Sequence, residues 1–216
     1  MPLYTADALI LRTYKLGEAD RIVVFLTRDR GKKRGVAKGA RRPRSRFGAA
    51  LEPMTEARVA YFEKERRELV GLNYAEPVRS PMDAPTFDAL GYIGYFAELL
   101  DEWAQEADAD DRLFRLGASM LDALSLGAPV EPLARYFECW LLRLQGVYPE
   151  ARGTLSDEAM AFLAASRTVT PQQVGAVAVS SAVLKELEQA HRALITMHLE
   201  KNLKSDRVLR DLRKHN

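Results

Sequence analysis

The chain has 216 residues, of which 47% are apolar and 29% charged, a composition typical of a globular protein with a sizeable hydrophobic core. No apolar run reaches the roughly 18–20 residues of a membrane span, and the N-terminus lacks a signal-peptide pattern. The single cysteine, Cys139, excludes an internal disulfide. We therefore expect a cytoplasmic protein without membrane attachment. The net charge of +2 conceals an asymmetry, because residues 1–79 carry +8, residues 80–158 carry −10 and residues 159–216 carry +4.

Residues 1–79 predict a small β-barrel. Short runs rich in β-branched and aromatic residues are separated by bends that contain glycine. The five predicted strands cover residues 8–11, 21–27, 34–39, 57–61 and 68–74. Five short strands in about 75 residues suit a closed barrel, and the OB-fold is the five-stranded barrel that binds single-stranded nucleic acid. We therefore expect an N-terminal OB-fold domain over residues 1–79.

The basic charge is concentrated in residues 28–46, which hold ten Lys and Arg side chains and a single Asp. Such a density is self-repelling unless a polyanion compensates it, and nucleic acid is the most common polyanion in a cytoplasm. A solvated loop that only aids solubility is the alternative interpretation. The candidate DNA-binding cations are Lys32, Lys33, Arg34, Lys38, Arg41, Arg42, Arg44 and Arg46.

Aromatic side chains accompany this basic segment. Phe25 lies in a predicted strand, which favours a place in the core. Tyr14 and Phe47 lie in stretches that resemble loops, and an exposed aromatic ring there can stack on a base. Tyr14 and Phe47 are therefore the candidate stacking residues, with core packing as the alternative for each.

After Pro77 the apolar pattern changes from a period of two residues to a period of 3.6, which indicates helices. The predicted helices cover residues 86–106, 111–126, 131–147 and about 182–202, with a short final helix that Ser205 can cap. Thr170 and Gln173 form a capping-box pattern, with Pro171 at the first helical position. We expect residues 80–216 to form an all-helical domain, so that the fold class is α+β, with the strands first and the helices after them.

The sequence offers no catalytic motif. It contains no P-loop, no dinucleotide-binding glycine pattern and no nucleophile elbow. His191 and His198 are two helical turns apart, about 10 Å, which is too far to share one ion. Cys139 has no neighbouring histidine, and the carboxylates of residues 108–111 fall between two predicted helices, where capping is their usual role. We therefore expect neither an enzyme nor a metal or other cofactor, with a cryptic metal nuclease as a remaining alternative.

A long ordered string of motifs resembles the RecO family. It runs through GEADRIV at residues 17–23, VAKGARRP at 36–43, SRFG at 45–48 and LEP at 51–53. Weaker similarity continues through RYFE at 135–138, GVYP at 146–149 and LKS at 203–205. One departure concerns the four-cysteine zinc motif that many members carry after the GVYP loop. Residues 150–155 read EARGTL, so we expect no zinc.

The resemblance implies an OB-fold joined to a helical domain in a recombination mediator. It implies binding of single- and double-stranded DNA and annealing of complementary strands. It also implies partnership with RecR and with single-stranded-DNA-binding protein (SSB), which together help RecA to load on SSB-coated DNA. The family breaks no covalent bond, and we expect it to act in the cytoplasm at the nucleoid. Another OB-type protein that acts on RNA or ribosomes is the alternative.

The resemblance further implies that the helical domain binds the acidic, apolar-ended tail of SSB. Such a tail suits an apolar groove with a cation at its rim. Cations are scarce in the acidic middle segment, and the candidates are Arg112, Arg115, Arg135 and Arg143. Pairing of Arg135 and Arg143 with helical carboxylates is the alternative interpretation.

Overall fold

The structure, a computed structural model, describes residues 2–63, 68–83, 86–149 and 155–213. The chain divides into two compact units. Unit 1 comprises Met1–Asp83 and Ile93–Leu121, and unit 2 comprises Ala84–Tyr92 and Asp122–Asn216.

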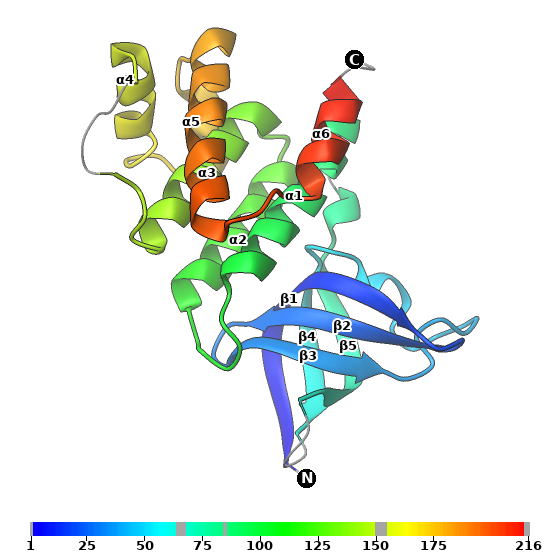
Figure 1. Cartoon of the computed structure of the whole chain (residues 1–216). Helices are drawn as coiled ribbons and strands as arrows, with labels where there is room; N and C mark the ends of the chain where they lie inside the picture. Colours follow the sequence, from blue (N-terminus) through cyan, green and yellow to red (C-terminus); the bar gives the residue numbers. More distant parts are fainter. Residues whose placement is uncertain (1, 64–67, 84–85, 150–154, 214–216) are drawn as a thin grey trace. The chain divides into compact units, whose positions relative to one another are not determined.

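Unit 1 contains a closed five-stranded barrel with the neighbour order β1-β2-β3-β5-β4 (Figure 1). Its strands are β1 (Leu3–Leu16), β2 (Asp20–Thr27), β3 (Gly31–Ala37), β4 (Glu56–Phe62) and β5 (Val70–Arg79). All neighbouring strands are antiparallel except β3 and β5, which pair in parallel. The predicted α+β class with an N-terminal OB-fold is confirmed. The strand β1 is much longer than the predicted 8–11, because polar residues on either side of that apolar run continue the pairing with β2 and β4.

Alternation along the strands fills the barrel. Ile10, Val23, Phe25, Val59 and Tyr61 belong to one buried cluster, which accounts for the β-branched and aromatic runs of the sequence. A short 3₁₀ turn, η1 (Gly48–Leu51), adds Ala50 and Leu51 to the same cluster.

Two helices follow the barrel, α1 (Phe87–Trp103) and α2 (Asp111–Ser125). The parts of both within residues 93–121 belong to unit 1. Gly117 of α2 approaches the barrel so closely that an added Cβ would lie 2.7 Å from a methyl group of Leu9. The apolar outer face of β1 and β2, which includes Leu9 and Leu26, is therefore buried rather than exposed to solvent. The last strand ends at Arg79, but unit 1 also includes residues 93–121, because helical segments bury this apolar face of the barrel. The division into domains 1–79 and 80–216 stays a prediction.

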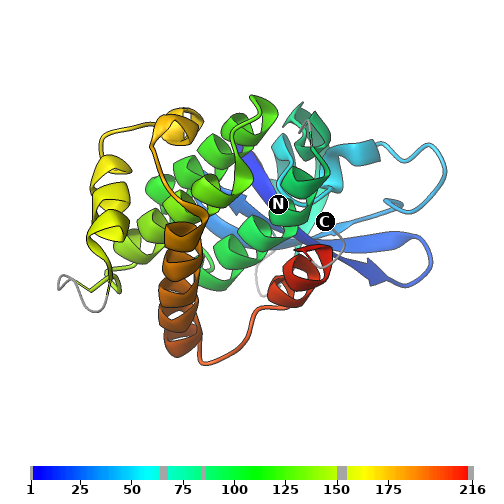
Figure 2. The same cartoon turned by 90° about the horizontal axis from the view of Figure 1, so that it is seen from above.

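Unit 2 is helical. Its elements are α3 (Val130–Leu144), α4 (Asp157–Ala165), η3 (Pro171–Ala176), α5 (Ser181–Leu199) and α6 (Ser205–Arg213). The short 3₁₀ turn η2 (Pro81–Asp83) belongs to unit 1. In Figure 2 the chain leaves α5, drawn in orange, through a short connection into α6, drawn in red. The Ser180 hydroxyl caps α5 by accepting from the Val183 N–H at 3.3 Å.

Two details of unit 2 differ from the predicted elements. The Thr170 capping box opens a six-residue 3₁₀ turn and not an α-helix, although the Thr170 N–H does donate to Gln173 Oε1 at 3.2 Å. The helix α4 was not predicted, because its short run DEAMAFLAA shows little amphipathic periodicity. No helix in the described residues is both long and apolar enough to cross a membrane.

Candidate nucleic-acid interface

The structure splits the basic segment 28–46 into two parts with different surroundings. The first part, residues 28–33, forms the β2–β3 turn and the start of β3. The second part begins at Arg34 and continues into the loop that follows β3. We call the cations of the second part the loop cations: Arg34, Lys38, Arg41, Arg42, Arg44 and Arg46.

Cations of the first part are paired with carboxylates. Lys32 Nζ lies 3.4 Å from Asp101 Oδ1 and donates to the Asp101 main-chain carbonyl at 2.6 Å. Lys33 Nζ donates to Glu63 Oε1 at 2.8 Å. Their side chains are only 16% and 17% exposed, so both predicted DNA contacts are largely occupied within the protein.

The loop that carries most of the loop cations is held against the β1–β2 turn. Arg41 Nη1 donates to the Gly17 carbonyl at 2.7 Å, and the Arg41 N–H donates to the Ala19 carbonyl at 2.9 Å. The Gly39 N–H donates to Asp20 Oδ1 at 2.7 Å. Both segments therefore lie at one end of the barrel, as Figure 1 shows. These bonds give a glycine-rich basic loop a defined place.

The loop cations are open to solvent. All six are exposed, and no carboxylate within ion-pair distance of them occurs in the part of the chain that the structure describes. Arg46 stacks over the Phe47 ring, with the guanidinium carbon 5.1 Å from the ring centroid, which leaves its N–H groups free to donate. Five of the six cations lie in the loop after β3 and Arg34 lies in β3 itself, and together they form a surface suited to a polyanion.

Tyr14 is 43% exposed on the outer face of β1, and its stacking role stays a prediction. In the strand register Tyr14 lies opposite Ile22 of β2, and Ile22 lies opposite Val36 of β3. Because the neighbouring residues Val23 and Ala37 face the core, this row faces outward, and Ile22 and Val36 are only partly buried. We call Tyr14, Ile22 and Val36 the outer strip.

Arg12 lies beside the outer strip. Its Nη1 donates to the Tyr14 hydroxyl at 3.0 Å, and its guanidinium carbon lies 5.9 Å from the Tyr14 ring centroid. Burial alone opposes the charged form, but the Asp101 carboxylate and the bond to Tyr14 together raise the pKa of the Arg12 guanidinium above its usual value.

The prediction for Phe47 is wrong. Its side chain is 2% exposed and belongs to the barrel core, so it cannot stack on a base. The apolar spacing of Phe47, Ala50 and Leu51 could have indicated one buried face on a short turn. The same period-two pattern that identified the strands could have found Ile22 and Val36, which the sequence analysis missed.

The four candidate SSB-tail cations fall in different places. Arg112 and Arg115 are exposed on α2 in unit 1, and Arg115 Nε lies 2.8 Å from Asp111 Oδ2. Arg135 and Arg143 lie on α3 in unit 2. The guanidinium of Arg143 lies 5.2 Å from the Tyr148 ring centroid.

Arg135 is only 3% exposed and forms ion pairs, which is the alternative that the sequence left open. Its Nη2 donates to Glu138 Oε1 at 2.6 Å, and its Nη1 lies 3.3 Å from Glu188 Oε2. Glu138 also contacts the buried His191, whose Nδ1 lies 2.9 Å from Glu138 Oε2.

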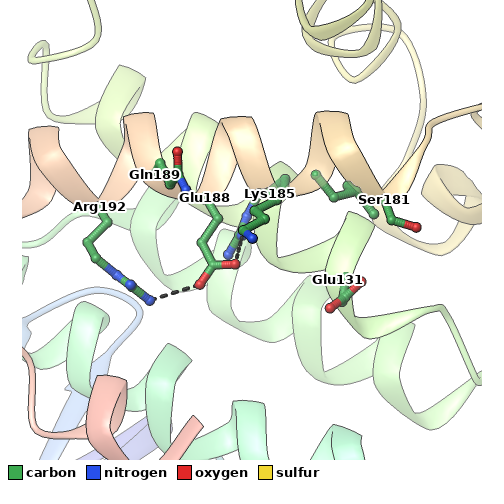
Figure 3. A pocket seen from close by; sticks show the side chains of 8 residues that line it. Glu131, Ser181, Lys185, Glu188, Gln189 and Arg192 are labelled. Atoms are coloured by element: carbon green, nitrogen blue, oxygen red, sulfur yellow. Dashed lines mark hydrogen bonds and ion pairs between the residues drawn. The ribbon is translucent and has the colours of Figure 1, made fainter. Parts of the chain in front are cut away.

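Arg135 nevertheless borders a pocket of about 370 Å³ in unit 2. Figure 3 shows this pocket along α5, with Arg192 joined to Glu188, a contact of 2.8 Å. Leu184 is the one hydrocarbon side chain among its lining residues, and the other seven residues are polar or charged. The residues that line it are Glu131, Arg135, Ser181, Leu184, Lys185, Glu188, Gln189 and Arg192.

The groups considered for catalysis have structural roles. Asp110 Oδ1 accepts from the main-chain N–H groups of Arg112 and Leu113, which confirms capping at the start of α2. Burial raises the pKa of the Cys139 thiol to about 11, which keeps it protonated and unreactive. Among the described residues no three His, Cys, Asp or Glu side chains gather as metal ligands would. Residues 150–154, where the zinc motif is expected to be missing, lie outside the described part of the chain.

Comparison with known proteins gives consistent matches. Residues 1–81 match the family model described as Recombination protein O N terminal, and residues 84–153 match Recombination protein O C terminal. The DNA repair protein RecO of Koribacter versatilis is 42% identical over 152 residues, which cover 68% of this chain and 61% of the relative. The protein of that name from Anaeromyxobacter sp. (strain K) is 41% identical over 144 residues, or 65% of this chain and 56% of the relative.

The DNA repair protein RecO of Bifidobacterium adolescentis is 43% identical over 129 residues, which cover 58% of this chain and 51% of the relative. These matches span between half and three-fifths of the relatives' own lengths. Two consecutive models of one family cover most of the chain, and the barrel has the OB-fold that the first of them implies, so the chain belongs to the RecO family.

Proposed function

We propose that this protein is a DNA-repair and recombination mediator that binds single- and double-stranded DNA and anneals complementary strands. Together with RecR it helps RecA to load on DNA coated with SSB. The observation that carries the proposal is the group of exposed loop cations on an OB-fold, none of which has a carboxylate within ion-pair distance among the described residues. Family membership supports it, because the relatives are named DNA repair proteins.

The loop cations suit contact with a phosphate backbone. Each cation that meets a phosphate releases condensed counterions, which favours binding without reading the base sequence. A repair factor that must act at any sequence needs this kind of contact. Annealing also needs repulsion between two backbones to be screened, and a cluster of exposed Arg and Lys side chains supplies that screening.

The outer strip complements the loop cations. A single strand exposes the faces of its bases, and the Tyr14 ring with two aliphatic neighbours offers a surface for stacking. We propose that bases contact the outer strip while phosphates contact the loop cations. A duplex hides its base faces, so it engages the cations alone.

The SSB tail is proposed to bind in unit 2, at the pocket along α5. Arg135, Lys185 and Arg192 give this pocket cationic groups for an acidic tail, and Leu184 offers limited apolar contact. Arg135 can take part only if the tail replaces part of its pairing with Glu138 or Glu188. Lys185 is exposed and Arg192 is partly exposed, so both are more accessible than Arg135.

We propose no bond-breaking step. The nucleophile Cys139 is buried and protonated, and His191 is enclosed between Glu138 and Tyr148. Asp110 is used as a helix cap. The mediator role therefore rests on binding and positioning.

The proposal is tested by annealing of complementary DNA strands coated with SSB. The variant Lys38→Gln with Arg42→Gln and Arg44→Gln removes three loop cations. If each contacts one phosphate of a single strand, the salt slope falls by about 2, which corresponds to roughly 500-fold weaker binding at about 0.05 M salt. We expect annealing to fail with it.

The matched control removes the same charge elsewhere, through Arg58→Gln, Arg167→Gln and Arg207→Gln, all at exposed positions. It should retain annealing and most of the DNA affinity. Equal loss in both variants, or no DNA binding by the native protein, contradicts the proposal. Tighter binding to RNA of the same sequence without annealing favours the RNA-binding alternative instead.

A further inference from the structure

Asp101, near the C-terminal end of α1, is held by cations from two different strands of the barrel. Arg12 of β1 places Nη2 2.9 Å from Asp101 Oδ2, and Lys32 of β3 places Nζ 3.4 Å from Oδ1. The Asp101 side chain is 12% exposed. Glu102 adds a second carboxylate 3.6 Å from the same Arg12 nitrogen. The Asp101 carboxylate thus pairs with two cations, one from each of the two strands that neighbour β2.

Because Asp101 lies in the last turn of α1, the nearby cations Arg12 and Lys32 stabilise its negative charge. A negative side chain in the last turn of a helix is repelled by the partial negative charge of the helix C-terminus. Arg12 and Lys32 offset that repulsion. The main chain also holds the cluster in place, because the Lys32 N–H donates to the Gln105 carbonyl at 3.1 Å and the Ala107 N–H donates to the Lys32 carbonyl at 3.2 Å.

The cluster lies directly beside the outer strip. Arg12 is opposite Val24 in the register, two positions from the pair formed by Tyr14 and Ile22. Two positions along a strand correspond to about 7 Å. Lys32 lies opposite Leu26, four positions from the pair formed by Ile22 and Val36, or about 13 Å. A nucleic-acid strand that continues from the outer strip in this direction would therefore meet Arg12 first and Lys32 next if Asp101 did not hold them.

We propose that Asp101 sets the edge of the nucleic-acid surface, acting as an intramolecular substitute for a phosphate group. It keeps Arg12 and Lys32 out of the path of the strand, so that phosphates contact the loop cations alone. This inference rests on the proposed function, since it concerns the extent of the same surface. It gives part of the acidic segment 80–158 a role in limiting where DNA binds.

The test measures the affinity of single-stranded DNA as a function of salt for the variant Asp101→Asn. The variant removes the carboxylate charge that faces Arg12 and Lys32 and leaves the main-chain carbonyl that accepts from Lys32 Nζ at 2.6 Å, so the lysine keeps its place while its charge becomes available to a phosphate. If both freed cations contact phosphates, the salt slope steepens by about 1.4, and affinity at about 0.05 M salt rises up to roughly 70-fold. Glu52→Gln is the matched control, because Glu52 is exposed and its loss changes the net charge equally without releasing Arg12 or Lys32.

Lys32→Gln decides the same question without depending on the stability of Asp101→Asn. In the native background it should leave the salt slope unchanged, because Lys32 is already neutralised. In the Asp101→Asn background it should remove about half of the gained slope. A weaker salt slope for Lys32→Gln in the native background overturns the inference. A salt slope and affinity of Asp101→Asn equal to those of Glu52→Gln also overturn it. If the native protein binds no DNA, the proposed function fails and this inference fails with it, whereas normal native binding with either contrary result overturns the inference alone.

Discussion

Gly31 begins β3 at a point where the β2–β3 turn meets the segment between α1 and α2. Its φ angle of +66° lies in the left-handed region, and an added Cβ would lie 2.3 Å from the Asp108 carbonyl oxygen. The Asp108 main-chain nitrogen would lie only 2.5 Å away. Because both neighbours are main-chain atoms, no change of rotamer can relieve the contact. The substitution Gly31→Ala must therefore move one segment away from the other.

The expected cost has two parts. A left-handed conformation costs a non-glycine residue about 1–2 kcal/mol. Separation of the segments also removes the bonds from the Lys32 N–H to the Gln105 carbonyl and from the Ala107 N–H to the Lys32 carbonyl, each of which contributes about 1 kcal/mol. We expect Gly31→Ala to lower the free energy of unfolding by about 3–4 kcal/mol.

Gly17 provides a matched comparison. Its φ angle is +57°, but nothing lies within 4 Å of an added Cβ. Gly17→Ala should therefore show only the conformational part, about 1–2 kcal/mol. The difference of about 2 kcal/mol between the two variants measures the close approach at Asp108.

Urea unfolding followed by circular dichroism gives both free energies, and thermal unfolding provides a second reading. For a chain of this size, 1 kcal/mol corresponds to about 2–4 °C in Tm, so Gly31→Ala should lower Tm by about 10 °C. Equal destabilisation by Gly31→Ala and Gly17→Ala would refute the reasoning, because it would show that the approach of Asp108 has no energetic consequence.

Four further predictions concern other parts of the chain. Glu138→Ala leaves the buried Arg135 without its nearest carboxylate and should cost about 3–5 kcal/mol in urea unfolding, whereas a change below about 1 kcal/mol contradicts this. Burial raises the pKa of Cys139 to about 11, so little thiolate exists at pH 8. Iodoacetamide should therefore label the native protein far more slowly than the urea-unfolded protein, and equal labelling rates contradict this. In a filter-binding assay, Tyr14→Ala should weaken single-stranded DNA binding by about 1–3 kcal/mol, whereas Tyr14→Phe should retain the native affinity. An equal loss of affinity in both variants points to the hydroxyl instead of stacking. Phe47→Ala should instead cost about 3–5 kcal/mol of stability in urea unfolding, because it empties part of the barrel core, and a near-native stability contradicts that.

The strand and helix content could be predicted because each element is amphipathic at its own period. The runs around Val23 and Phe25 alternate inward and outward, and both side chains do enter the barrel core. The α4 segment lacked such a stripe and was missed. The Thr170 capping box was recognised, but a cap specifies how a turn begins and not how many residues follow it.

By itself the sequence determined the α+β class, the position of the basic segment and the family motifs, because local periodicity and charge density are properties of neighbouring residues. Only the tertiary structure decided which cations are available. Lys32 and Asp101 are 69 residues apart, and nothing local to either predicts their contact. The burial of Phe47 was decided in the same way, because the barrel interior that takes up its ring is built from strands distant in the sequence. Burial and ion pairing depend on side chains that only the folded chain brings together, and they turn a uniform basic run into a paired part and an exposed part.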